Sequence, residues 1–180
     1  MMPMSVTALL GKNLFLLDGG VINDLLMKVH LISSPIDWLV NGGTALGAVI
    51  AVNCWVGIPF NMLLLTSGLT GISTDIYESA SMDGANAFKR FIYITLPLMK
   101  PAMLSVLMLG FIYTFKAFDL MYIMTAGGPF NSTDVLGTYA YSKAFTQYEF
   151  SQGSAIAMVL FACLFLVGIF YLKLLSKEDD

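Results

Sequence analysis

The stretch TALGAVIAVNCWVGIPFNMLLLT occupies residues 44–66 and contains no charged side chain. Roughly 18 or more consecutive apolar residues are long enough to cross a bilayer as a helix, because each residue adds about 1.5 Å along the axis. The alternative, a buried helix of a soluble bundle, would carry polar residues at helical spacing along one face. Thr44–Thr66 has no such face, so it predicts a membrane-spanning helix.

Three further apolar runs favour the same interpretation. They are Ala102–Thr125, Ser154–Leu175 and the shorter Met4–Leu17, which Lys12 interrupts. The 180 residues are 57% hydrophobic and 12% charged, about half the charged share of a soluble domain. We therefore expect an all-α integral membrane protein, in which a single domain over residues 1–180 forms a bundle of three to four transmembrane helices.

The positions of Lys and Arg predict which segments face the cytoplasm, since cytoplasmic loops are enriched in both. These residues are Lys89, Arg90 and Lys100 in residues 67–100, Lys143 in residues 127–152, and Lys173 and Lys177 in the tail. We expect Ser67–Lys100 and the C-terminus to be cytoplasmic. We expect Asp18–Gly43, with a short helix near Asn23–His30, and Gly127–Gln152, as an exposed loop, to lie outside.

The sequence offers no parts for enzyme or metal chemistry. Cys54 and Cys163 lie inside apolar runs, where free thiols behave as small apolar side chains, and no Cys or His spacing typical of a metal site occurs. The sequence contains no HExxH, GxSxG or GxGD pattern, which disfavours an intramembrane enzyme, and no basic stripe for nucleic acid. We expect neither a metal nor a cofactor.

The charged segment Ser67–Lys100 predicts two short helices. Asp75 and Glu78 have the spacing of a capping box, so a helix should run through Ile76–Asp83, and Gly84 is placed to end it. A second helix is expected over Ala85–Tyr93. Pro97 and Pro101 should then break the chain, with Pro101 in the first turn of the next span. From periodicity alone, the favoured interpretation of this segment is an ordinary amphipathic connector lying on the bilayer.

The order of residues in this loop carries a resemblance to a known family. Glu78-Ser79-Ala80 is followed by three residues, Gly84, nine residues and Ile94-Thr95-Leu96-Pro97. This pattern resembles the EAA signature of ABC importer permeases, Glu-Ala-Ala, three residues, Gly, nine residues, Ile, one residue, Leu-Pro. Every spacing fits, and Ser79, a similarly small residue, is the one departure from the signature.

The resemblance extends over most of the chain. The matching segments are Asn53–Asn61, Asp83–Ala85, Phe115–Asp119 and Thr125–Pro129. They look like the sugar-permease branch, of the maltose and glycerol-phosphate importer type. Members of that family usually have about six spans, so this sequence, with the last three or four, looks truncated at its N-terminus. A truncated permease that serves as a non-transporting membrane adaptor is an alternative function.

The resemblance also implies a mechanism and partners. In the family, the EAA helix docks into a cleft of a cytoplasmic ABC ATPase, and ATP-driven closure of two ATPases moves two permease subunits between inward-facing and outward-facing states. The implied partners are the ATPase subunits, a second permease subunit in a heterodimer and an extracytoplasmic substrate-binding protein, all at a bacterial inner membrane. The implied coupling residues are Glu78, Ser79, Ala80, Asp83, Gly84, Ala85, Phe88, Arg90, Leu96 and Pro97.

Four residues are candidates for the substrate path. Lys116 and Asp119 lie three residues apart on one face of an expected span, where they could line a water-filled path or, alternatively, pair with each other near the outer interface. Asn53 and Gly57 are one turn apart on the charge-free span. They could serve helix packing, whereas the resemblance implies that the matching positions help to line a sugar site.

Overall fold

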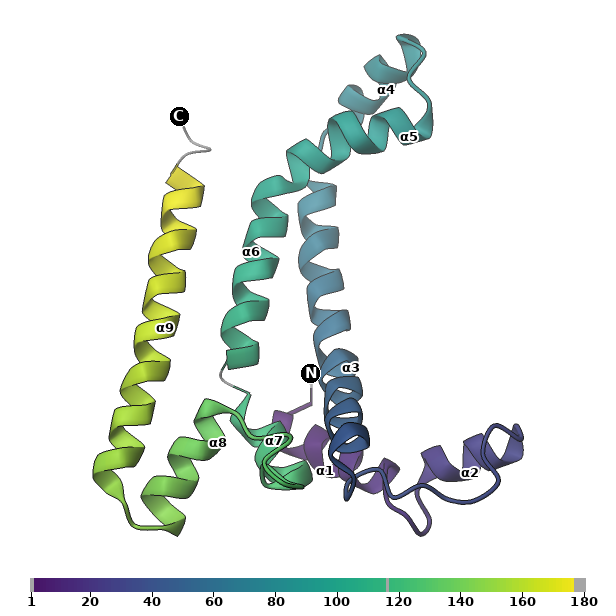
Figure 1. The fold of residues 1–180 in the computed structure, drawn as a ribbon. Helices are drawn as coiled ribbons and strands as arrows, with labels where there is room; N and C mark the ends of the chain where they lie inside the picture. Colours follow the sequence, from purple (N-terminus) through teal and green to yellow (C-terminus); the bar gives the residue numbers. More distant parts are fainter. Residues whose placement is uncertain (1, 116, 177–180) are drawn as a thin grey trace. The chain divides into compact units, whose positions relative to one another are not determined.

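A computed structural model describes the backbone of residues 2–115 and 117–176, and these residues contain helices and no β-strand (Figure 1). The helices are α1 Met4–Leu14, α2 Val21–Lys28, α3 Gly42–Thr70, α4 Thr74–Met82, α5 Ala87–Arg90, the π-helix η1 Phe91–Thr95, α6 Leu96–Phe115, α7 Phe118–Thr125, α8 Leu136–Tyr141, the π-helix η2 Ser142–Thr146 and α9 Phe150–Ser176. The all-α prediction is confirmed.

Three helical stretches of the described chain are long and apolar enough to cross a membrane. They are Gly42–Thr70, Ala87–Phe115 and Phe150–Lys173. The fourth candidate, Met4–Leu17, is not a span, because α1 contains only 11 residues and reaches about 16 Å, roughly half the thickness of a bilayer core. Residues 2–115 and 117–176 therefore contain three candidate spans, at the lower end of the expected range.

The second span starts and ends earlier than the sequence indicated. Instead of Ala102–Thr125, one continuous helix runs over Ala87–Phe115 through α5, η1 and α6, and a new helix, α7, begins at Phe118. Pro97 and Pro101 do not break the helix. Proline is tolerated in membrane helices where local π-type adjustments satisfy the freed backbone groups, and here Pro97 lies two residues after the end of the π-helix η1.

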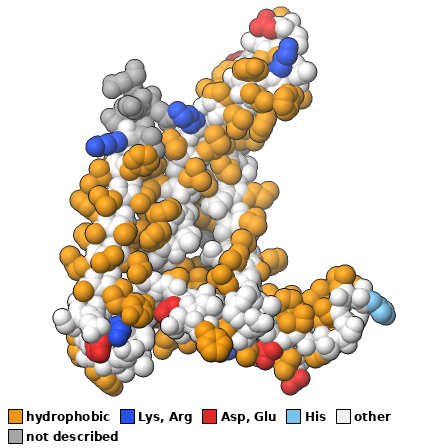
Figure 2. All heavy atoms as spheres, viewed as in Figure 1, with side chains coloured by type: hydrophobic (Ala, Val, Ile, Leu, Met, Phe, Trp, Pro, Cys, Tyr) orange, Lys and Arg blue, Asp and Glu red, His pale blue; other side chains and the backbone are white. Residues whose placement is uncertain are grey.

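The chain divides into two compact units. One consists of Met1–Val56 and Tyr113–Leu164, and the other of Gly57–Ile112 and Phe165–Asp180. The helices α3, α6 and α9 each contribute residues to both units. In Figure 2, hydrophobic side chains cover most of the visible surface of α9, as expected for a helix that faces lipid or other apolar helices.

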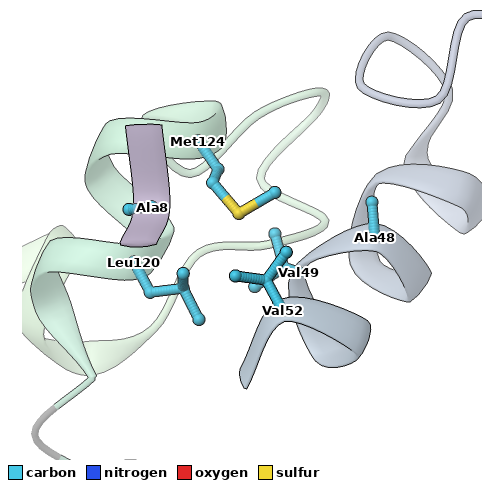
Figure 3. Packing of buried hydrophobic residues seen from close by; sticks show 6 residues of the cluster. All are labelled: Ala8, Ala48, Val49, Val52, Leu120 and Met124. Atoms are coloured by element: carbon cyan, nitrogen blue, oxygen red, sulfur yellow. The ribbon is translucent and has the colours of Figure 1, made fainter. Parts of the chain in front are cut away.

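The core of the first unit joins α1, α3 and α7. Its buried residues are Ala8, Ala48, Val49, Val52, Leu120 and Met124. Figure 3 shows Leu120 and Met124 of α7 pointing toward Val49 and Val52 of α3. Gly11 of α1 lies so close to Val52 that an added Cβ would stand 2.7 Å from the valine Cγ2. The absence of a side chain at Gly11 therefore lets α1 approach α3.

The two segments expected to be outside are more ordered than loops. The short helix predicted near Asn23–His30 is confirmed as α2, two residues earlier. The expectation of a simple exposed loop over Gly127–Gln152 is wrong, because α8, η2 and the start of α9 fall within it. The rings of Phe118, Tyr122 and Tyr141 lie 5.0–5.1 Å apart and connect α7 to α8.

Candidate functional site

The helix α4 carries the Glu-Ser-Ala triplet and begins at a serine cap. Ser73 is the N-cap residue, and its Oγ accepts a hydrogen bond of 3.3 Å from the Asp75 N–H. The capping box expected from Asp75 and Glu78 is wrong, because the N-cap is two residues earlier. Ser73 already has the extended backbone that an N-cap requires. Asp75 lies instead in the first turn, where its negative charge interacts favourably with the helix dipole and stabilises the helix.

The turn after α4 depends on Gly84, as predicted. Its φ is +78° and no atom lies within 4 Å of the position of a Cβ. The N–H of Ala85 donates to the Ala80 carbonyl at 2.9 Å, and the N–H of Gly84 donates to the Ser81 carbonyl at 3.1 Å. These two bonds form a Schellman motif. A residue with a Cβ would be strained at this left-handed position.

The second helix of the loop starts at Ala87, two residues later than expected, because Asn86 caps it. The Asn86 Oδ1 accepts a hydrogen bond of 2.8 Å from the Lys89 N–H. The helix then continues through η1 into α6. The second helix of the loop is therefore the first part of a span and not a separate element. The sequence signal for this start was Asn86 itself, since Asn is among the strongest N-cap residues.

Two side-chain hydrogen bonds cross from α4 to this helix, and sequence reasoning missed both. The hydroxyls of Tyr77 and Thr95 lie 2.9 Å apart, and Arg90 Nη1 donates to Ser81 Oγ at 2.6 Å. Of these residues, only Arg90 was a predicted site residue. The other three lie up to 18 positions from their partners, a separation at which no local pattern indicates a contact.

All ten predicted coupling residues lie in the second unit. Glu78, Ser79, Asp83, Gly84, Phe88, Leu96 and Pro97 are exposed, and Ala80, Ala85 and Arg90 are half-buried. Phe88 is 70% exposed although it is aromatic. Among the described residues, no cation lies within ion-pair distance of the Glu78 carboxylate. These residues thus present an acidic group and apolar surface to solvent (Figure 2).

The predicted substrate-path residues are not brought together as one group. Asn53 and Gly57 lie on α3 and are both half-buried. Lys116 lies outside the described residues. Asp119 is exposed in the first turn of α7. Asp119 thus belongs to α7, which begins after α6 has ended at Phe115, and the expected pairing of Lys116 with Asp119 stays a prediction.

A pocket of about 530 Å³ lies in the first unit, between the end of α6 and the start of α8. Its lining residues are Thr114, Phe115, Asp134, Val135, Leu136 and Tyr139. Thr138 Oγ1 donates a hydrogen bond to Asp134 Oδ1 and accepts one of 2.9 Å from the Val135 N–H, so the carboxylate is fixed in place. The pocket combines aromatic, hydroxyl and carboxylate groups, and no local sequence pattern indicated it.

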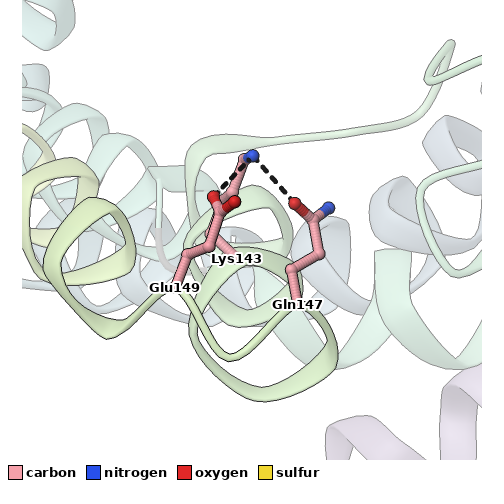
Figure 4. A network of polar contacts seen from close by, with 3 residues as sticks. All are labelled: Lys143, Gln147 and Glu149. Atoms are coloured by element: carbon pink, nitrogen blue, oxygen red, sulfur yellow. Dashed lines mark hydrogen bonds and ion pairs between the residues drawn. The ribbon is translucent and has the colours of Figure 1, made fainter.

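Lys143 stabilises the loop between η2 and α9 through side-chain contacts (Figure 4). Its Nζ donates to Glu149 Oε2 at 3.0 Å and to Gln147 Oε1 at 2.8 Å, and it lies 6.0 Å from the centre of the Tyr139 ring. The hydrogen bond to Glu149 raises the pKa of Lys143 above its ordinary value. The same cation therefore holds the approach to α9 and lies beside a residue of the pocket.

Comparison with known proteins identifies relatives across almost the whole chain. Residues 1–177 match the family described as "Binding-protein-dependent transport system inner membrane component". The sulfoquinovosyl glycerol transport system permease protein SmoG of Agrobacterium fabrum is 33% identical over 99% of this chain and 57% of its own length. The trehalose/maltose transport system permease protein MalF of Thermococcus litoralis is 38% identical over 78% of this chain and 47% of its own length.

A solved structure shows the same fold. A chain of a bacterial ABC transporter involved in the import of the acidic polysaccharide alginate superposes with a TM-score of 0.86 at 19% identity, over all of this chain and 63% of that chain. This chain spans about half of the length of the curated relatives it matches.

Proposed function

Because the chain belongs to the family of binding-protein-dependent transport system inner membrane components, we propose that it forms part of the translocation path of an ABC importer. In this proposal the chain has no catalytic step of its own. A separate ATPase subunit hydrolyses ATP, and the loop that contains α4 transmits the resulting movement to the spans. The chain is a multi-pass membrane protein.

The observation that carries the coupling role is the exposed acidic helix α4. Glu78 projects from a helix whose start, end and orientation are each fixed by specific contacts, at Ser73, Gly84 and the two crossing hydrogen bonds. A fixed helix transmits displacement to the span that follows it, whereas a flexible connector would absorb it. The exposed apolar ring of Phe88 beside it favours a protein partner.

We propose carbohydrate as the substrate class. The named relatives include permease proteins of a sulfoquinovosyl glycerol transport system and of a trehalose/maltose transport system. The pocket at Asp134 and Tyr139 has the hydrogen-bonding and aromatic groups that suit a hydroxyl-rich ring. Asn53, Gly57 and Asp119 stay proposed residues of the path, and the exposed position of Asp119 is compatible with contact to water.

The proposed arrangement places this subunit in a bacterial inner membrane with α4 and the C-terminus in the cytoplasm. Its partners there are two ABC ATPase subunits, and a second permease subunit lies beside it in the membrane. An extracytoplasmic binding protein delivers the substrate to the opposite side. The excess of Lys and Arg in residues 67–100 supports this orientation.

The test is co-purification of the ATPase with charge-reversed permease. We expect Glu78→Arg to reduce the amount of ATPase retained on the tagged permease by about tenfold, as the loss of one charge-assisted contact of about 1.4 kcal/mol implies. The matched control is Asp37→Arg, which makes the same charge change at an exposed residue of the segment proposed to face outward. Equal retention by both variants would exclude the coupling role of Glu78.

A further inference from the structure

The loop helix α4 has no packed core to hold it. None of its nine residues is buried, and it is connected to the rest of the second unit by short turns at Gly71–Ser73 and Asp83–Asn86. The hydrogen bonds at Ser73 and Gly84 fix where α4 begins and ends, but they do not join α4 to the span. Something other than burial must fix the direction of α4 relative to the span.

Two hydrogen bonds meet this requirement. We define the brace as the contacts Tyr77–Thr95, at 2.9 Å, and Ser81–Arg90, at 2.6 Å. Tyr77 and Ser81 are four residues apart, so both lie on the face of α4 that is turned toward the second helix. Glu78 lies next to that face and stays exposed. The two contacts are separated by about one helical turn and resist both tilting and rotation of α4.

The π-helix η1 explains how one helix supplies both partners. In an α-helix, two residues five apart lie on different sides, because 3.6 residues complete a turn. The wider turn of a π-helix, with bonds from i to i+5, brings them to the same side. Thr95 Oγ1 indeed donates to the Arg90 carbonyl at 3.4 Å. The π-helix therefore directs Arg90 and Thr95 together toward α4.

We propose that the brace makes α4 and the Ala87–Phe115 helix move as one body, so that Tyr77, Ser81 and Thr95 are positioning residues for coupling. This inference rests on the proposed function for its role in transport. The partner touches the exposed side of α4, and the brace on the neighbouring face carries the displacement into α6. Without it, α4 would follow the partner by rotating at its two connecting turns and the span would stay in place.

The first experiment measures the brace without any partner. Spin labels are attached to Met82→Cys and Leu107→Cys in a Cys54→Ser/Cys163→Ala background, since Met82 and Leu107 are 89% and 69% exposed and lie in the same unit. We expect one narrow distance distribution by pulsed electron paramagnetic resonance. Tyr77→Phe and Thr95→Val, which each remove one hydroxyl, should broaden it, and the Tyr77→Phe/Thr95→Val pair should broaden it no further.

Two matched variants serve as controls for this measurement. Thr95→Ser keeps the hydroxyl and should keep the narrow distribution. Tyr93→Phe makes the same change as Tyr77→Phe on a ring that is 76% exposed, and it should also leave the distribution narrow. If Tyr77→Phe and Thr95→Val give distributions as narrow as the parent, the brace does not fix α4 and the proposal is overturned.

The second experiment adds the ATPase subunits and compares the nucleotide-free complex with the complex trapped by ATP and vanadate. We expect the label distance to be unchanged by nucleotide in the braced protein and to shift in Thr95→Val, where α4 moves without α6. If nucleotide leaves the label distance of Thr95→Val unchanged while the ATPase is bound, the coupling role of the brace is overturned. If the ATPase fails to bind even the parent protein, the proposed function is wrong, and the first experiment still decides whether the brace exists.

Discussion

Asn23 is 1% exposed and its side-chain amide joins three segments of the first unit. The Nδ2 group donates to the carbonyls of Leu16, Leu17 and Ile36, and the Oδ1 accepts from the Ile36 N–H and from Trp38 Nε1. A buried amide with all of its groups satisfied stabilises a unique arrangement, because each orphaned partner costs about 1–3 kcal/mol.

We therefore expect Asn23→Ala to destabilise the protein by about 3 kcal/mol, because it leaves the Trp38 N–H and the Ile36 N–H without their acceptor. Asn13→Ala changes the same residue type on the exposed surface of α1 and should be close to neutral. Thermal unfolding in detergent checks both. A melting temperature of Asn23→Ala equal to that of Asn13→Ala would contradict this role of Asn23.

Residues of the candidate site differ in how far the sequence could indicate them. Glu78 and Gly84 were predicted correctly as parts of α4 and its turn, because a fixed-spacing motif and the requirement for positive φ are both local signals. Tyr77 and Thr95 were not, because their contact depends on how two helices fold back on one another. Asp134 was missed for the same reason, since its pocket forms only when α8 approaches the end of α6.

At the scale of elements, Gly68 sets the approach of α3 to α6 in the second unit. A Cβ at Gly68 would lie 2.6 Å from the Ala102 Cβ and 3.4 Å from the Met99 Cε. Small residues permit such close packing of membrane helices. One turn further along α6, the hydroxyls of Ser105 and Tyr171 lie 3.0 Å apart and connect it to α9.

We expect Gly68→Ala to cost about 1–3 kcal/mol through overpacking, and Gly68→Ala/Ala102→Gly to recover most of that stability because the methyl group is only moved across the interface. Gly47→Ala, on the same helix with no atom within 4 Å of its Cβ position, serves as the control. Detergent melting temperatures measure all three. A double variant no more stable than Gly68→Ala would argue against this contact.

Element boundaries were harder to predict than the elements themselves. The apolar runs Thr44–Thr66 and Ser154–Leu175 were correctly assigned to one long helix each, because hydrophobic length is a strong signal. The end of α6 at Phe115 was not predicted, since the apolar run continues through α7 while the backbone turns at Ala117. The start of the second span at Ala87 was missed because two prolines suggested an interruption. The π-helix η1 lets the helix continue, and it has no recognised local pattern.

For the whole molecule, the sequence predicted the class and the family, and both are confirmed by the helices and by the match over residues 1–177. It could not predict that α1 packs into the core of the first unit rather than crossing the membrane, because that depends on the close contact of Gly11 with Val52. Sidedness, in contrast, was assigned from six basic residues, and it stays a prediction.

Sidedness is also the property on which the central claim depends, because an ATPase can reach α4 only from the cytoplasm. The measurement is the reaction of single cysteines with a membrane-impermeant maleimide in sealed cells, using Met82→Cys and, as the outward control, Tyr148→Cys in the Cys54→Ser/Cys163→Ala background. Both positions are exposed, at 89% and 75%. We predict that Tyr148→Cys reacts in intact cells and that Met82→Cys reacts only after permeabilisation. Labelling of Met82→Cys in intact cells would place α4 outside and contradict the account.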